Sequence, residues 1–405
     1  MNEKLNIDNG AVLTEKERRK MRRNALIKMG AMGLFILIVL IFSSIAWFTM
    51  NREVEGTGAQ MRSTDTPFEV AVVAPYTNTP DYSALLQSQF SFDTTKHETG
   101  SGTSEIKCLM TDATADANNP MRGMQPGSYG TITFQIKPKS AGTYTLHFDI
   151  ATAGYHAEFA TNAEGAILPN QLKTKTVEGK QVPIFYSLAD YTEMQAEVIS
   201  DSNAEQQQIA DAREDVVNCP KAARFLQGHI LFFENWDSST KYYSKFINPS
   251  AGFNRSYTFT ADDVAGNITS DRQEELTVTL YWIWPNTFGQ MVLDNGNINL
   301  SERDAAMFSS SQTAVNGQSP REELTTYITA HGDQFFESTN AMFSDTVVNE
   351  VVTETEAAKI AASIAGLSTN PDNIIPLSNG YNNADQIIGE NVQILFAEIT
   401  ASMPS

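Results

Sequence analysis

Histidine and carboxylate side chains carry most general acid–base and zinc chemistry, so they would be the first candidates for a catalytic site. The chain has only five histidines, and they are scattered: His97, His147, His156, His229 and His331. His147 and His156 lie near one end of an expected hairpin and could meet in space, but a pair of surface histidines is the favoured interpretation over a functional site. HExxH, GxSxG and phosphate-binding glycine motifs are absent from the sequence. We therefore expect no catalytic residue, no metal site and no cofactor, and a protein that is not an enzyme.

One segment superficially resembles a calcium-binding loop. Residues 294–299 read DNGNIN, and closely spaced oxygen ligands suit Ca²⁺. The EF-hand pattern fails because glycine stands third and the twelfth position is Ala305 instead of glutamate. The favoured interpretation is a turn that caps a helix over residues 301–313, and a weak extracellular cation site is the alternative.

Cys108 and Cys219 are the only cysteines, which excludes a multi-cysteine zinc module. In an exported protein the two could form a disulfide that closes a loop of about 110 residues and stabilises the fold by several kcal/mol. Two free thiols are the alternative, and the sequence places both cysteines in loop-like segments.

Trp282 and Trp284 belong to the most β-prone stretch of the chain, residues 275–285. Two residues apart on a strand, they share one face with neighbouring leucines. They could form a carbohydrate-binding platform, but a position in the protein core is the favoured interpretation.

The clearest pattern is an uncharged segment near the N-terminus. Residues 31–50 contain no charged side chain, and as a helix they would span about 30 Å, the thickness of a bilayer core. Residues 16–28 carry seven Lys/Arg against one acid. By the positive-inside rule, this arrangement keeps the N-terminus in the cytoplasm and exports the rest of the chain.

Two fates remain open for this segment. It is either a retained transmembrane helix or a signal peptide cut between Ala46 and Trp47, where Ser44 and Ala46 offer the small side chains that a signal peptidase needs. We expect a basic cytoplasmic tail over residues 1–30 and a polar connector over residues 51–66. The protein is then a single-pass membrane protein with an extracellular body, or it is secreted after cleavage.

The exported body shows the alternation of β-strands. Residues 129–138 and 143–150 alternate apolar and polar side chains on either side of a short turn, which predicts a hairpin with one buried face. A final strand over residues 391–401 must pair with distant strands. We therefore expect residues 67–405 to form a mainly β, jelly-roll or Ig-like sandwich with a helical insertion at about residues 300–390. The side chains expected in its core are Phe134, Ile136, Leu146, Phe148, Leu276, Val278, Leu280 and Leu395.

The net charge of −20 is unevenly distributed along the chain. The first 30 residues carry eight Lys/Arg and four Asp/Glu, which leaves 20 basic and 44 acidic side chains in the remainder. A body this acidic repels phosphate backbones, so we expect no nucleic-acid partner.

Several of these residues also resemble a known family. Ala46-Trp47-Phe48, followed by Asn51-Arg52 and a Gly56-x-Gly58 connector, is similar to the exported proteins processed by the SipW-type signal peptidase. Pro126-Gly127 before the alternating strands resembles the Lys-Pro-Gly-Asp segment of the TasA/camelysin family, although Ser128 stands where that family has aspartate. The resemblance implies a jelly-roll-like sandwich and a surface protein of the bacterial extracellular matrix or biofilm, in some members a fibre-forming subunit.

Three functions follow as expectations. The first is a non-catalytic surface or matrix protein with a fibre-forming or adhesive role, whose partners are the membrane, a signal peptidase and further copies or other surface proteins. The second is a membrane-anchored module that binds a carbohydrate or another ligand. The third is a surface protease with a site assembled from distant residues.

Overall fold

A computed structural model describes residues 66–72, 103–110, 124–177, 180–293, 305–309 and 317–403. The chain separates into two units, Met1–Arg62 and Ser63–Ser405, and every described residue belongs to the second. The predicted membrane segment, the cleavage position at Ala46 and Trp47, and the DNGNIN segment all lie outside the described residues. No helix among those that the structure describes is long and apolar enough to span a bilayer.

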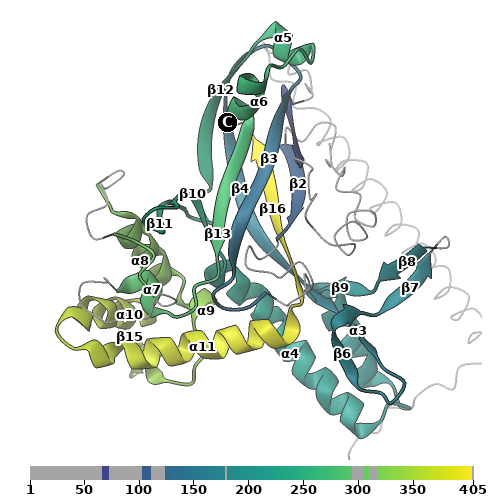
Figure 1. Cartoon of the computed structure of the whole chain (residues 1–405). Coiled ribbons are helices and arrows are strands. Elements are labelled where there is room, and N and C mark those ends of the chain that lie inside the picture. The colour runs from purple at the N-terminus through teal and green to yellow at the C-terminus, as the bar shows by residue number, and fades with distance from the viewer. Residues whose placement is uncertain are drawn as a thin grey trace, which may run out of the picture. The chain divides into compact units, whose positions relative to one another are not determined.

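Two antiparallel five-stranded sheets form the body of the second unit (Figure 1). The first sheet has the order β1 (Phe68–Val72), β3 (Tyr129–Pro138), β13 (Thr277–Ile283), β10 (Leu231–Asp237) and β11 (Tyr242–Ile247). The second has the order β12 (Phe253–Phe259), β4 (Gly142–Ala157), β16 (Ile394–Ser402) and β2 (Thr103–Leu109), with β9 (Phe185–Ser187) also paired to β4. The expected mainly β architecture with added helices is therefore confirmed.

The main core lies between these sheets and is built by the period-two alternation seen in the sequence. All eight side chains expected in the core are at most 1% exposed: Phe134, Ile136, Leu146, Phe148, Leu276, Val278, Leu280 and Leu395. Trp282 and Trp284 are also buried in it, which confirms their core position and removes them as a carbohydrate platform.

The expected hairpin between β3 and β4 is wrong. β3 pairs with β1 and β13, whereas β4 pairs with β12, β16 and β9 in the opposite sheet. The turn at Gly142 carries the chain across the core, so that the rings of Phe134 and Phe148 face one another with centroids 5.7 Å apart. Alternation requires only that each strand bury one face, and a crossing between sheets satisfies that requirement as well as a hairpin does.

Helices close both ends of the sandwich. α4 (Gln206–His229) buries Phe225 and Leu226 in the same core as the strands, and α3 (Leu188–Ser200) packs alongside it. The short helices α5 (Ala261–Val264) and α6 (Ser270–Glu275) lie at the other end, at the top of Figure 1.

A second core lies on the outer side of β10, β11 and β13, where helices between β13 and β16 cover the sheet. It contains Leu231 and Phe233 from β10 together with Leu324, Phe335 and Tyr381 from the helices. These helices are α7 (Gly289–Val292), α8 (Pro320–Ala330), α9 (Gly332–Phe335), α10 (Glu356–Ala365) and α11 (Ile374–Asn391), with 3₁₀ turns at Ala341–Phe343, Gly366–Ser368 and Pro371–Asn373.

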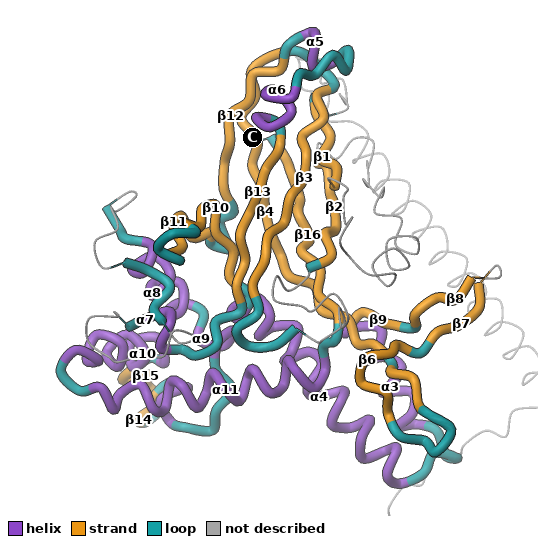
Figure 2. The backbone as a smooth tube through the Cα atoms, in the orientation of Figure 1, coloured by secondary structure: helices purple, strands orange, loops and turns teal. Residues whose placement is uncertain are grey.

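Three two-stranded ribbons complete the described secondary structure. They are β5 (Phe159–Thr161) with β6 (Ile167–Leu172), β7 (Thr174–Val177) with β8 (Lys180–Pro183), and β14 (Thr346–Val348) with β15 (Val351–Glu354). Figure 2 shows these ribbons in orange, apart from the strands of the two sheets.

Candidate functional site

An open polar pocket lies where α6 meets the edge strand β12. Its volume is about 390 Å³. Consecutive residues of β12 form one wall, and Arg272 and Glu275 of α6 form the other. The lining residues are Arg255, Ser256, Tyr257, Thr258, Arg272 and Glu275.

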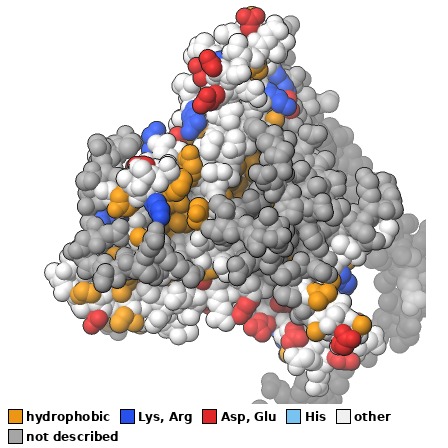
Figure 3. Space-filling view, in the orientation of Figure 1, with side chains coloured by type: hydrophobic (Ala, Val, Ile, Leu, Met, Phe, Trp, Pro, Cys, Tyr) orange, Lys and Arg blue, Asp and Glu red, His pale blue; other side chains and the backbone are white. Residues whose placement is uncertain are grey.

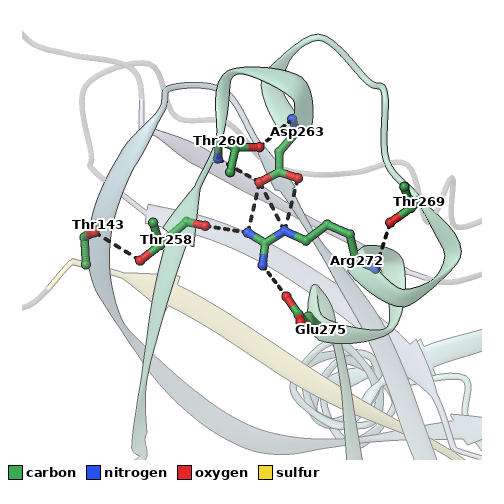
Figure 4. Close-up of polar contacts among 7 residues, drawn as sticks. All are labelled: Thr143, Thr258, Thr260, Asp263, Thr269, Arg272 and Glu275. Carbon is green, nitrogen blue, oxygen red and sulfur yellow. Dashed lines mark hydrogen bonds and ion pairs between the residues drawn. The ribbon is translucent and has the colours of Figure 1, made fainter.

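Arg272 organises the α6 side of this pocket (Figure 4). Its guanidinium donates to both carboxylate oxygens of Asp263 at 2.9–3.2 Å, to Glu275 Oε2 at 2.5 Å and to the backbone carbonyl of Thr258 at 2.5 Å. Thr260 caps α5 by accepting from the backbone N–H of Asp263, whose carboxylate in turn accepts from the backbone N–H of Thr260. Hydrogen bonding from Arg272 lowers the pKa of Asp263 to about 2.

This arrangement also covers part of a sheet edge. β12 is an edge strand of its sheet, and Arg272 donates a hydrogen bond to the carbonyl of Thr258. Without this hydrogen bond the carbonyl could accept from an additional strand. On the outer face, Thr258, Ser256 and Asn254 hydrogen-bond across to β4, as in the 3.1 Å contact between Thr258 and Thr143. The edge is therefore tied to both α6 and its neighbouring strand.

The other side of the pocket contains the least satisfied polar atom of the site. The Tyr257 hydroxyl is buried and has no hydrogen-bond partner, although the residue lines the pocket. Beside it, Arg255 pairs with Glu234 of β10 at 3.0 Å. The side chains that this pocket offers to a polar ligand are the charged ones of Arg255, Arg272 and Glu275, because the Tyr257 hydroxyl is buried and the hydroxyls of Ser256 and Thr258 bond across to β4.

An aromatic surface lies on the outer side of the first sheet. Trp236 packs beside Tyr281 and Tyr243, with ring centroids 6.2 and 6.4 Å away, and Tyr129 nearby on β3 is 37% exposed. Figure 3 shows hydrophobic side chains gathered at the level of β10, β11 and β13. In this cluster Tyr243 is buried, whereas Trp236 and Tyr281 are partly exposed, so Tyr129, Trp236 and Tyr281 are the rings that a ligand could reach here.

His147 and His156, which the sequence allowed to meet in space, do not meet. Both lie on β4, nine residues apart, which corresponds to about 30 Å along a strand. His147 bonds to Asn254 and Asp149 at the surface, whereas the ring of His156 stacks on Tyr191 with centroids 3.8 Å apart. Within the described ranges, no group of three histidine, cysteine or acidic side chains is placed to hold a metal ion.

His229 belongs to a buried polar cluster that the sequence did not indicate. Its Nδ1 lies 2.6 Å from Asp385 Oδ1, its Nε2 lies 3.0 Å from the carbonyl oxygen of Phe335, and its ring stacks on Tyr381 at 4.0 Å. Trp284 Nε1 donates to the same Asp385 oxygen at 2.6 Å. The cluster joins α4, α9, α11 and the residue that follows β13 inside the protein, so we interpret it as structural.

Cys108 and Cys219 are both buried, free thiols. They lie on β2 and α4, so the expectation that both occupy loops is wrong. Cys219 donates to Asn391 Oδ1 at 3.3 Å. Burial raises the pKa of Cys108 to about 12 and that of Cys219 to about 11, which keeps both thiols protonated and unreactive near neutral pH.

No known family model, curated protein or solved structure matches this chain.

The pocket and the aromatic surface had no recognisable sequence motif. Arg272 and Asp263 are nine residues apart on separate short helices, and Trp236 and Tyr281 are 45 residues apart in the sequence. The only local signal was Thr260 followed by Asp263, the spacing of a helix cap, which predicts where α5 begins but not what its carboxylate binds.

Proposed function

We propose that this protein is a non-catalytic, exported surface or extracellular-matrix protein with a structural or adhesive role. It is held by its N-terminal segment or released by signal peptidase, and its copies associate with one another. The observation that carries the proposal is the strand order of the two sheets. The step from this order to a function is an analogy of fold, since jelly rolls host many activities.

The strand order supports the jelly-roll form of sandwich over the Ig-like form. Numbering β2, β3, β4, β10, β11, β12, β13 and β16 from one to eight gives the sheet orders 1-8-3-6 and 2-7-4-5. This is the order of two interleaved Greek keys, with β1 added beside β3. A jelly roll is the sandwich that the resemblance to the TasA/camelysin family implies.

Export is tested by protease treatment of intact cells that produce the full chain with one epitope tag at each end. We expect the C-terminal tag to be removed and the N-terminal tag to be protected, because the basic tail before residues 31–50 remains in the cytoplasm. Lysed cells provide the control for protease access to both tags.

A matched variant tests the physical reason. Replacing the seven Lys/Arg of residues 16–28 by glutamine removes the charge bias without altering the apolar segment, and we expect mixed or inverted orientation. A wild-type body that resists protease in intact cells, but not in lysed ones, would contradict the proposed export.

A membrane-anchored ligand-binding module is the second candidate, favoured by the pocket at Arg255 and Tyr257 and by the aromatic surface around Trp236. Exposed aromatic rings and polar pockets suit polysaccharides. Saturation-transfer NMR with soluble cell-wall and capsular glycans tests it. Arg255→Ala should remove binding at the pocket, and Trp236→Ala should remove binding at the aromatic surface. Signals that neither substitution changes would contradict a site at both places.

A further inference from the structure

The β14–β15 hairpin exposes an unusual amount of apolar surface. Its four valines are 49–63% exposed, although valine is normally a core residue. They lie on both faces of the ribbon, because Val347 pairs with Val352 and Val348 pairs with Val351. No face of this ribbon is therefore covered by the protein's own core.

The base of the hairpin is nevertheless held firmly. Asp345 accepts from the backbone N–H of Glu356 at 2.8 Å, and Lys359 donates to the carbonyls of Ala341 and Ser344 at 2.8 and 2.7 Å. The turn residues Asn349 and Glu350 have φ values of 50° and 66°, as a type I′ hairpin turn requires. The ribbon is thus a defined structural element, fixed at its base and at its tip.

A two-stranded ribbon is marginally stable in water and gains stability from further strands. Within the described part of the chain, β14 and β15 pair only with each other. An apolar strand covers exposed valine best. Residues 346–353 read TVV-NE-VVT, so the two strands carry the same residues in mirror order on either side of the turn. A second copy of the ribbon therefore offers side chains that match it.

The charges on the two strands indicate which edge of the ribbon can pair with a second copy. β15 is flanked by Glu350 and ends in Glu354, so its pairing with a second β15 would bring carboxylates together. β14 contains no charged residue. Val348 pairs with Val351 next to the turn, so its backbone N–H and C=O point toward β15. Successive residues of a strand direct these groups to opposite sides, so the N–H and C=O of Val347 point toward the open edge of β14.

We propose that this protein self-associates by antiparallel pairing of β14 with β14 of a second copy, with the two-fold axis at Val347. The two Val347 residues exchange both backbone hydrogen bonds, and the two ribbons become one four-stranded sheet with valine on both faces. This inference rests on the proposed self-associating surface role and names the element that carries it. The acidic body repels its copies over about 10 Å at 0.1 M salt, so added salt strengthens the association.

Disulfide cross-linking of the full chain in its membrane tests the pairing directly. Two Val347 residues in a hydrogen-bonded antiparallel pair have Cα atoms about 5.5 Å apart, within the range that a disulfide bridges. Val347→Cys should therefore give a covalent dimer under mild oxidation. The native Cys108 and Cys219 are buried and leave the background low.

Two single variants are matched controls. Val348→Cys tests the register, since in this pairing the two residues at position 348 are diagonal neighbours about 7–8 Å apart and cross-link poorly. Val217→Cys tests random collision, because Val217 is a 55% exposed valine on α4. A dimer with Val347→Cys, and not with the two controls, supports the proposal.

Other outcomes overturn it. Equal dimer yields at positions 217 and 347 would show collision without a specific interface. A monomer at position 347, or a cross-link to a different protein, would also refute pairing between copies. Since protease accessibility measures export separately, a failed cross-link in a correctly exported protein would contradict this inference and leave the proposed export intact.

Discussion

The buried cluster around Asp385 gives the sharpest prediction about stability. Asp385 accepts hydrogen bonds from His229 Nδ1 and Trp284 Nε1, both at 2.6 Å. The second ring nitrogen of His229 faces the carbonyl of Phe335. Asp385 is therefore the shared acceptor for two buried side-chain donors that come from distant parts of the chain.

Removing that carboxylate should be costly. Asp385→Ala leaves a buried imidazole and a buried indole N–H without an acceptor. Each unsatisfied buried donor costs about 1–3 kcal/mol, so losing the acceptor of both the His229 ring and the Trp284 indole should cost about 2–6 kcal/mol. Asp385→Asn retains one acceptor oxygen, so we expect a smaller loss of about 1.5–3 kcal/mol.

Equilibrium urea unfolding, followed by tryptophan fluorescence, measures these differences in the free energy of unfolding. Asp372→Asn on the exposed 3₁₀ turn is the matched control, with an expected change within about 0.5 kcal/mol. A loss under about 1 kcal/mol for Asp385→Ala would refute the argument, because an orphaned buried donor alone should cost that much.

Three further predictions follow from the packing and charges. Phe148→Ala, at a fully buried position, should lower the free energy of unfolding by about 3–5 kcal/mol, and a change under about 1 kcal/mol in denaturant titration would contradict the position of β4. Since Arg272 lowers the pKa of Asp263 below its usual 3.8, the stability that this pair contributes is complete above about pH 4 and lost as the pH falls toward 2. Unfolding measured across that range should therefore show a shallower acid loss for Asp263→Asn than for the wild type. Cys108 and Cys219 should resist alkylation at pH 8 in the native protein and both react in denaturant, whereas no reaction in non-reducing denaturant would reveal a disulfide.

The core positions could be predicted from the sequence because burial on one face of a strand leaves a local trace. The alternation over Phe134 and Ile136, and again over Leu276, Val278 and Leu280, identified side chains that are all fully buried. The same local rule separates strands from helices, so a final strand over residues 391–401 and a helical insertion at about residues 300–390 were also expected, and the structure has β16 and α10 there.

Strand partners and candidate sites required the tertiary structure, because they depend on contacts between segments far apart in sequence. Alternation is the same whether β3 and β4 form a hairpin or face each other across the core, and only the backbone pairing distinguishes the two. His229 meets Asp385 across 156 residues, and the pocket joins β12 to α6. By itself, the sequence determined which faces are apolar and where charge is concentrated. The tertiary structure decided which apolar faces were covered, and it left the valines of β14 and β15 in contact with solvent.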